Sequence, residues 1–253
     1  MKPPLKKLIF LMIFLSPSNT LAAENSDVLA EKIANLLNIP RHSVFLECPS
    51  KEIDFLVLHG QKTIRMCLRK TDKKNRCEFS IHNLNIAPEK QKISFEALIE
   101  NNAPHPKNWL SLMQIHSFPD QGEKWRCPPF SLEYYDNTLR LFNRWDTTKT
   151  SKTSGYNCTE EGSSIKSKTI FSDVPLEKWM KISLDLKLSH GEDGYIMTSI
   201  NTHRFPKLIG PNIYNDSRPP FLKFGIYKPT SWDKEHKISC VTYRNIDISN
   251  ANK

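Results

Sequence analysis

The feature that most constrains the fold of this chain is an alternation of apolar and polar side chains, with a period of two residues, in nine short segments. Gly, Pro, Asn or Asp residues separate the segments and favour turns. Successive side chains of a strand point to opposite sides, so each segment predicts a strand with one buried side. The predicted strands are 53–58, 63–68, 76–82, 110–118, 139–145, 180–188, 195–200, 220–227 and 238–248. Many short strands predict an all-β jelly roll, a sandwich of two antiparallel sheets.

Two regions depart from this alternation. In residues 26–39 apolar side chains recur at helical spacing, which predicts a short N-terminal helix with Ser26 or Asp27 as N-cap and Pro40 at its end. Residues 146–169 are polar and rich in Ser, Thr and Lys, so we expect a long loop there. The sequence shows no internal repeat, and the chain fits one β domain of ordinary size.

The first residues have the order of a secretory signal peptide. A basic start leads into a short apolar run, Leu8–Leu15, and then into small residues before Ala22. The run is too short to cross a bilayer, which takes roughly 20 residues, although an uncleaved anchor is the alternative interpretation. We expect a secreted or periplasmic mature protein without a membrane partner. The expected division is a signal peptide over 1–22, a helical segment over 23–45 and the β domain over 46–253.

The charge of the chain suits a polyanionic partner. The full sequence has 36 Lys and Arg against 27 Asp and Glu, a formal charge of +9. Removal of the three signal lysines (Lys2, Lys6 and Lys7) lowers this value to +6. A moderately basic exported protein fits an acidic glycan, although solubility alone also accounts for such a charge.

All six cysteines follow the predicted signal, and an even number outside the cytoplasm permits up to three disulfides. Their pairing cannot be read from the sequence, although Cys158 would tie down the predicted long loop. The chain has no CxxC pair and no Cys/His cluster at zinc spacing, so we expect no metal site built on cysteine. The cysteines are Cys48, Cys67, Cys77, Cys127, Cys158 and Cys240.

Three of the predicted strands carry groups on one side that bind carboxylates and transfer protons. An ordinary solvated side would carry many Lys, Glu and Thr residues, and such a side is the alternative interpretation for each strand taken alone. Together the three strands predict a shared functional groove. The side chains concerned are Arg76, Glu78, Ser80 and His82 in the first strand, Leu112, Gln114 and His116 in the second, and Phe221, Lys223, Gly225 and Tyr227 in the third.

The same residues resemble the jelly-roll polysaccharide lyases, namely the heparin lyase I-like and glucuronan lyase families and, more distantly, the alginate lyases. Gln114-Ile115-His116 matches the QIH signature, and Arg76-Cys77-Glu78 resembles the early RxE motif. Phe221–Tyr227 is similar to the late strand YFKxGxY, and the preceding segment 210–216 is similar to the heparin lyase-like branch. Ser80 stands where alginate lyases often have a second Arg, which points away from alginate. The resemblance implies a concanavalin-like jelly roll and cleavage by β-elimination.

Such a reaction removes the C5 proton of a uronate, which is barely acidic while the neighbouring carboxylate is ionised. The carboxylate must therefore be neutralised and the developing dianion stabilised. The Gln114 amide can donate a hydrogen bond, and Arg76 can form a bidentate ion pair. Glu78 is expected to orient Arg76 or to bind sugar hydroxyls, and Lys223 to bind the substrate.

A base and an acid complete the reaction, and the resemblance assigns these roles to His116 and Tyr227. Tyr227 can do both if proton and leaving group lie on the same side of the sugar, and His116 is the base if they lie on opposite sides. The cations Lys223 and Arg76 would favour a transient phenolate. No redox cofactor is needed, and structural calcium is possible without an evident ligand loop. Further substrate contacts are hypothesised for Arg140 and Arg144, although a solvated strand side explains them slightly better.

Two other classes of function remain open. A lectin-like carbohydrate-binding protein would use the same groove, but binding needs no proton-transfer pair. A glycoside hydrolase needs two carboxylates roughly 5–10 Å apart, and no predicted strand has acids at positions i, i+2 and i+4. Export argues against a nucleic-acid partner. We expect a monomer that acts on an acidic, uronate-containing polysaccharide.

Overall fold

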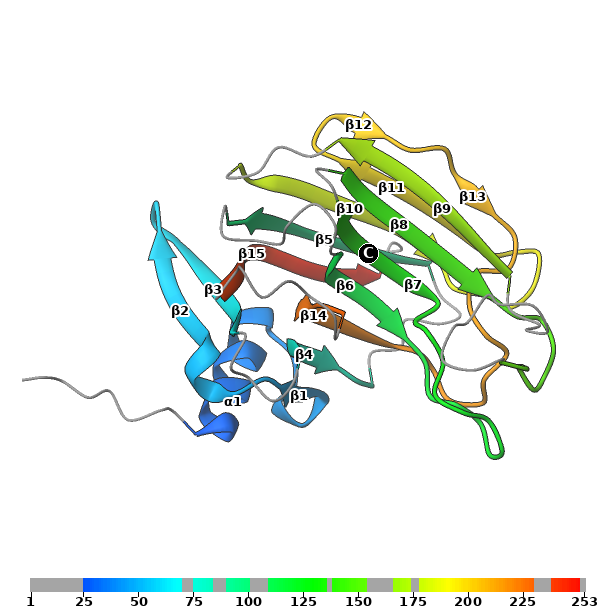
Figure 1. Cartoon of the computed structure of the whole chain (residues 1–253), viewed down its shortest axis with the longest axis horizontal. Coiled ribbons are helices and arrows are strands. Elements are labelled where there is room, and N and C mark those ends of the chain that lie inside the picture. Colours follow the sequence, from blue (N-terminus) through cyan, green and yellow to red (C-terminus); the bar gives the residue numbers. More distant parts are fainter. Residues whose placement is uncertain are drawn as a thin grey trace, which may run out of the picture.

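The computed structural model describes residues 25–69, 75–83, 90–100, 109–135, 138–153, 166–173, 178–229 and 238–250. Two antiparallel sheets pack face to face, with one short α-helix beside one end of the sandwich (Figure 1). The predicted jelly roll is confirmed. The predicted signal 1–22 and Cys158 lie outside the described residues.

The first sheet has seven strands and contains all three strands of the predicted groove. Antiparallel pairing brings together segments far apart in the sequence, because β14 lies between β4 and β6. The order is β1 (Val44–Glu47), β4 (Arg76–Ile81), β14 (Phe221–Tyr227), β6 (Leu110–His116), β7 (Phe130–Tyr135), β8 (Thr138–Trp145) and β9 (Lys166–Asp173).

The second sheet covers the apolar side of the first. Its order is β12 (His203–Arg204), β11 (Tyr195–Ile200), β10 (Met180–Lys187), β5 (Lys90–Ile99), β15 (Ile238–Asn250), β3 (Gln61–Arg69) and β2 (Ile53–Leu58), and β13 (Leu208–Ile209) pairs with β11. The core between the sheets is built from alternate residues of both, such as Phe224, whose ring contacts those of Phe79 and Phe95. Burial of these alternate residues leaves the opposite side of the first sheet available for polar groups.

Helix α1 (Ser26–Leu37) differs at both ends from the prediction. Asn25, not Ser26 or Asp27, is the N-cap, because its side chain accepts a hydrogen bond from the Asp27 backbone N–H at 3.1 Å. The helix ends before Pro40, because Asn38 adopts a left-handed conformation with φ 53° and caps the last carbonyls. Two short 3-10 turns, Arg41–Ser43 and Ser50–Glu52, flank β1.

Two disulfides join neighbouring strands. Cys48–Cys77 connects the residue after β1 to β4, and Cys67–Cys240 connects β3 to β15 in the second sheet. Cys127 is also disulfide-bonded. These bonds are consistent with a protein that works outside the reducing cytoplasm.

The alternation predicted nine of the strands but missed several others. Strands β1, β5, β7, β9, β12 and β13 were not predicted. The loop predicted over 146–169 is wrong at its end, because Lys166–Thr169 pair with β8 as part of β9. Among the helices that the described residues form, none is long and apolar enough to cross a membrane.

Candidate active site

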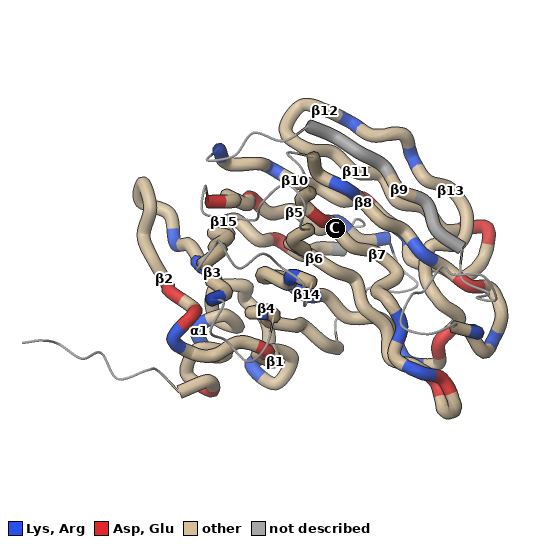
Figure 2. The backbone as a smooth tube through the Cα atoms, in the orientation of Figure 1, with Lys and Arg blue, Asp and Glu red and all other residues tan. Residues whose placement is uncertain are grey.

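The centre of the first sheet places the predicted site residues on one side. Tyr227 lies directly opposite Arg76, and Lys223 lies opposite Gln114. Residues directly opposite in an antiparallel pair share a side of the sheet, so these four face the same way. We call this surface of β1, β4, β14, β6, β7 and β8 the groove. Figure 2 shows basic positions along β8 and within β14 and an acidic one at the end of β1.

A bulge in β6 corrects one predicted side chain. The pairing of β6 with β7 shifts by one residue between Ser111 and Met113, so the extra residue lies in β6. The pairing of β6 with β14 shifts at the same level, between Phe224 and Tyr227, where the extra residue lies in β14. Leu112 is therefore part of the core rather than the groove, and Ser111 lies opposite Tyr227 instead. Strict alternation fails here because an extra residue changes the side on which the following side chains lie.

A tyrosine from the other sheet holds this bulge. Tyr243 of β15 is fully buried, and its hydroxyl lies 2.9 Å from the Leu112 carbonyl and 2.7 Å from the Gly225 carbonyl. One hydroxyl thus bridges β6 and β14 where their regular pairing is interrupted. Tyr243 is a positioning residue, because it fixes the backbones that carry Gln114 and Tyr227.

Gly225 cannot be replaced by a larger residue without moving the backbone. Its φ is 140°, and an added Cβ would lie 2.2 Å from the Cys77 carbonyl oxygen and 2.6 Å from the Glu78 Cα. Gly225 follows Lys223 by two residues and precedes Tyr227 by two, so the groove has no side chain between them. At Gly225 the backbones of β14 and β4 therefore approach each other closely.

Glu78 orients the Gln114 amide and also lies close to Arg76. Its Oε1 accepts a 2.7 Å hydrogen bond from the Gln114 amide, which leaves the second amide N–H for a substrate. Its Oε2 is buried without a hydrogen bond, 3.7 Å from Arg76 Nη1 and 3.8 Å from Lys223 Nζ. Burial raises the pKa of Glu78 to about 7, and the cations Lys223 and Arg76 offset only part of this rise.

Glu47, at the end of β1, completes the charged network. Its Oε2 accepts a 3.1 Å hydrogen bond from Arg76 Nη1, and its Oε1 accepts one from Lys223 Nζ. Burial by itself would raise the pKa of Glu47, but Lys223 and Arg76 outweigh that effect and hold the pKa below its ordinary value. Glu47 was not predicted as a site residue.

His116 lies at one end of the groove. Its ring stacks on Phe221 at 5.4 Å between centroids and meets the exposed Trp125 edge-on at 5.5 Å. Burial above all, together with the charges of Lys223 and Arg76, lowers its pKa to about 4, although the hydrogen bond with the Ser117 backbone acts in the opposite direction. Nδ1 lies 2.9 Å from the Ser117 N–H and 3.0 Å from the Ser117 carbonyl, so one tautomer presents Nε2 as a donor and the other as a base.

Tyr227 lies at the other end of the charged network. The Arg76 guanidinium lies over its ring at 4.5 Å, and Trp109 meets it edge-on at 5.1 Å. His116 is opposite Phe221, six residues from Tyr227, which is about 20 Å of extended strand. Gln114 lies between the two, with its amide drawn toward Tyr227 by Glu78. His116, Gln114 and Tyr227 therefore lie on the same side of the sheet, but His116 and Tyr227 do not contact each other.

The two predicted arginines of β8 lie on the groove side and have partners. Arg140 pairs with Glu133 of β7 at 3.2 Å and lies over the Tyr135 ring at 4.3 Å. Arg144 donates to the Pro128 carbonyl at 3.2 Å. Burial raises the pKa of Glu133, and the charges of Arg144 and Arg140 offset part of this rise. The two arginines extend the polar surface two strands beyond Gln114.

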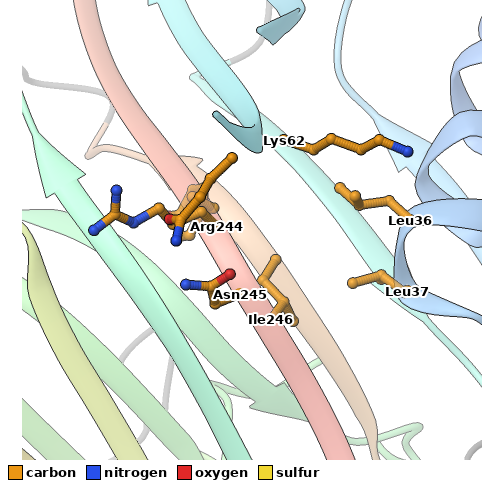
Figure 3. A pocket seen from close by; sticks show the side chains of 8 residues that line it. Leu36, Leu37, Lys62, Arg244, Asn245 and Ile246 are labelled. Carbon is orange, nitrogen blue, oxygen red and sulfur yellow. The ribbon is translucent and has the colours of Figure 1, made fainter. Parts of the chain in front are cut away.

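The segment 210–216, singled out by the sequence, forms part of the wall at the His116 end. Its buried Asn212 accepts from the Ser189 N–H and donates to the Lys187 carbonyl, both at 2.9 Å. Asp216 and Ser117 line a cavity of about 380 Å³ there. A smaller hollow of about 210 Å³ lies between α1 and β15, lined by Leu36 and others, away from the groove (Figure 3).

Alternation in the sequence could have revealed some of the missed residues. Residues 130–135 alternate between buried Phe130, Leu132 and Tyr134 and the groove-side residues that include Glu133, so β7 carried the same signal as its neighbours. Glu47 alternates with Leu46 in a strand of only four residues, too short for a reliable pattern. Within the described residues, no group of three or more His, Cys, Asp or Glu side chains could hold a metal ion.

Comparison with known proteins identifies the family. Among solved structures, the chain is similar to an endo-β-1,4-glucuronan lyase from the fungus Trichoderma reesei, with a TM-score of 0.63 and 14% identity over 79% of this chain and 87% of that one. It is also similar to a botulinum neurotoxin type C structure, with a TM-score of 0.54 and 11% identity over 82% of this chain and 43% of that one. Such low identities show a shared fold. No curated protein matches significantly.

The match at the level of sequence is more specific than the shared fold. A sequence model of the polysaccharide lyase family matches residues 48–244. This range begins just after β1 and includes β4, β6 and β14, the three strands that form the centre of the groove. The chain belongs to the polysaccharide lyase family.

Proposed function

We propose that this polysaccharide lyase cleaves an acidic, uronate-containing polysaccharide by β-elimination and leaves an unsaturated sugar. The observation that carries the proposal is the arrangement around the bare Gly225 backbone. An amide (Gln114), a guanidinium (Arg76) and a phenol (Tyr227) flank this glycine on the same side of the sheet. The likeness to a glucuronan lyase supports a uronate substrate.

The first task is neutralisation of the substrate carboxylate. With the uronate over Gly225, its carboxylate accepts the free N–H of the Gln114 amide and a further N–H of Arg76, whose guanidinium has five donors. The hydrogen bond to Glu78 fixes the amide before the substrate arrives. Preorganised donors stabilise the enolate-like charge that develops when the C5 proton leaves.

Tyr227 performs both proton transfers in this proposal. In its deprotonated form it takes the C5 proton, and the resulting phenol then protonates the leaving oxygen, with the Arg76 guanidinium over its ring. His116 is less suitable as the base, because its pKa of about 4 makes it weakly basic and it lies opposite Phe221. His116 instead binds a neighbouring sugar together with Trp125.

Ultraviolet absorbance tests the reaction, because elimination creates a conjugated double bond and hydrolysis does not. The protein is mixed separately with glucuronan, heparin, chondroitin and alginate. Absorbance that rises with at least one polyuronate supports the proposal. Binding without a rise on any of them would favour the lectin-like alternative, and new reducing ends without a rise would favour a hydrolase.

Two variants separate the roles of Tyr227 and His116. Tyr227→Phe is expected to lower kcat by about 10²–10⁴-fold, because it removes the proton carrier. His116→Ala is expected to raise KM with a smaller change in kcat. Tyr195→Phe, on the second sheet, is the matched control and should keep wild-type kinetics. A Tyr227→Phe protein with normal kcat would contradict the mechanism, and an equal loss of kcat in both variants would assign the base to His116.

A further inference from the structure

Glu47 occupies the two cations that a substrate carboxylate would approach. We propose that Glu47 is a specificity-determining residue, which limits the groove to polyuronates with one carboxylate per sugar and disfavours sulfated polyanions. The inference rests on the proposed function, because it concerns the substrate class of the same site. Two features support the inference: the carboxylate partners that the cations already have, and the N–H groups that remain free to bind a ligand.

The two cations differ in what they can still offer. The Lys223 side chain is only 5% exposed, and Glu47 and Glu78 are its carboxylate neighbours. Arg76 is 32% exposed and contacts Glu47 through Nη1, so other guanidinium N–H groups can reach a ligand. The pair thus has two positive charges. Glu47 compensates one of them, and the buried Glu78, whose pKa is about 7, leaves the other uncompensated below that pH. A single carboxylate suffices to balance the remainder.

A disulfide restrains the backbone next to Glu47. Glu47 is the register partner of Glu78 in the β1–β4 pair. The next residue, Cys48, forms a disulfide with Cys77, which stands between Arg76 and Glu78 in the sequence. This bond holds the end of β1 against β4, where the Glu47 carboxylate accepts a hydrogen bond from Arg76.

Two cations farther along the groove share one carboxylate. Arg140 pairs with Glu133 at 3.2 Å, and the charge of Arg144 acts on the same carboxyl. A sulfated chain brings several negative charges per disaccharide and loses hydration on binding, so it requires cations without partners. Among the described cations of the six groove strands, each lies near a carboxylate, and Arg140 and Arg144 share one. This pattern suits a sparsely charged polymer.

Binding measurements on Glu47→Gln test the inference. The variant keeps the shape of the side chain but removes its charge, and Asp54→Asn on β2 is the control with the same change in net charge outside the groove. Affinity for heparin and for glucuronan is measured by affinity electrophoresis over a range of salt concentrations. We expect Glu47→Gln to tighten heparin binding by about tenfold and glucuronan binding by much less, with a steeper salt dependence for heparin.

The ratio of the two affinities decides the outcome. An unchanged ratio in Glu47→Gln, or an equal change in Asp54→Asn, would overturn the inference. Should Glu47→Gln fail to fold, Glu47→Asp keeps the charge but shortens the side chain and loosens its contact with Lys223, so an intermediate ratio is expected and a wild-type ratio would overturn it. Binding does not require turnover, so a wild-type protein that binds polyuronates without cleaving them would defeat the proposed function alone.

Discussion

Glu78 shows how one buried carboxyl sets the charge of the groove. Its side chain is buried (2% exposed), accepts a hydrogen bond from the Gln114 amide and lies near Arg76 and Lys223. The sequence indicated that Glu78 belongs to the site, because it alternates with the core residues Cys77 and Phe79. The sequence could not indicate that the carboxyl partner of Gln114 would be Glu78, because the contact depends on β14 lying between β4 and β6.

The raised pKa of Glu78 predicts a pH dependence of stability. Its pKa is about 7 in the folded protein against an ordinary value of 4.5, so between these values the folded protein keeps a proton that the unfolded chain has lost. The free energy of unfolding therefore falls as pH rises through this window, by about 3 kcal/mol. Urea unfolding of wild type and Glu78→Gln at pH values below, within and above the window measures it. A difference between the two proteins that stays constant with pH would contradict the assignment.

Strand pairing explains which parts of the site were predictable. The residues of β4, β6 and β14 face the groove because apolar side chains alternate with them, and this alternation is visible in the sequence. The bulge at Leu112 is not visible, because it depends on the carbonyls that Tyr243 bridges from the other sheet. Strand β1 was missed because its four residues provide too short a pattern, and Glu47 was missed with it.

Gly225→Ala tests the close approach of β14 and β4. The added methyl would meet the Cys77 carbonyl at 2.2 Å, so we expect a loss of more than about 2 kcal/mol of stability and displacement of Tyr227. Gly122→Ala is the matched control, because Gly122 also has a positive φ of 90° but no atom within 4 Å of an added Cβ, and it should cost about 1 kcal/mol. Chemical denaturation measures both. Equal losses would mean that backbone conformation, not the contact with β4, makes glycine necessary.

In the sandwich as a whole, the two sheets and the disulfides contribute to the structure in different ways. The first sheet carries the groove, and the second closes the core behind it and supplies Tyr243. The jelly roll was predictable because many short alternating segments have few other ways to bury their apolar sides. The pairing of the cysteines was not, because it depends on which strands become neighbours in space.

Removal of each disulfide should therefore have different effects. Cys67–Cys240 links residues 173 apart and Cys48–Cys77 links residues 29 apart, so loss of the first pair through serine substitution is expected to lower stability more, each by about 2–5 kcal/mol. Loss of Cys48–Cys77 should also change affinity for polyuronates, because it frees Glu47. Thermal unfolding and binding assays on the two double variants measure these effects. An unchanged affinity without Cys48–Cys77 would show that strand pairing alone holds Glu47.

The indole rings beside the groove give the protein a built-in optical reporter. Trp125 is 68% exposed and contacts the His116 ring. Trp109 contacts the Tyr227 ring at the other end of the polar network. A polymer that fills the groove from one end to the other would exclude water from both rings and shift their fluorescence. A short oligosaccharide would affect only one of the two rings. Variants that each lack one of the two tryptophans would separate their signals, and oligosaccharides of increasing length would show how many sugar units are needed to reach both.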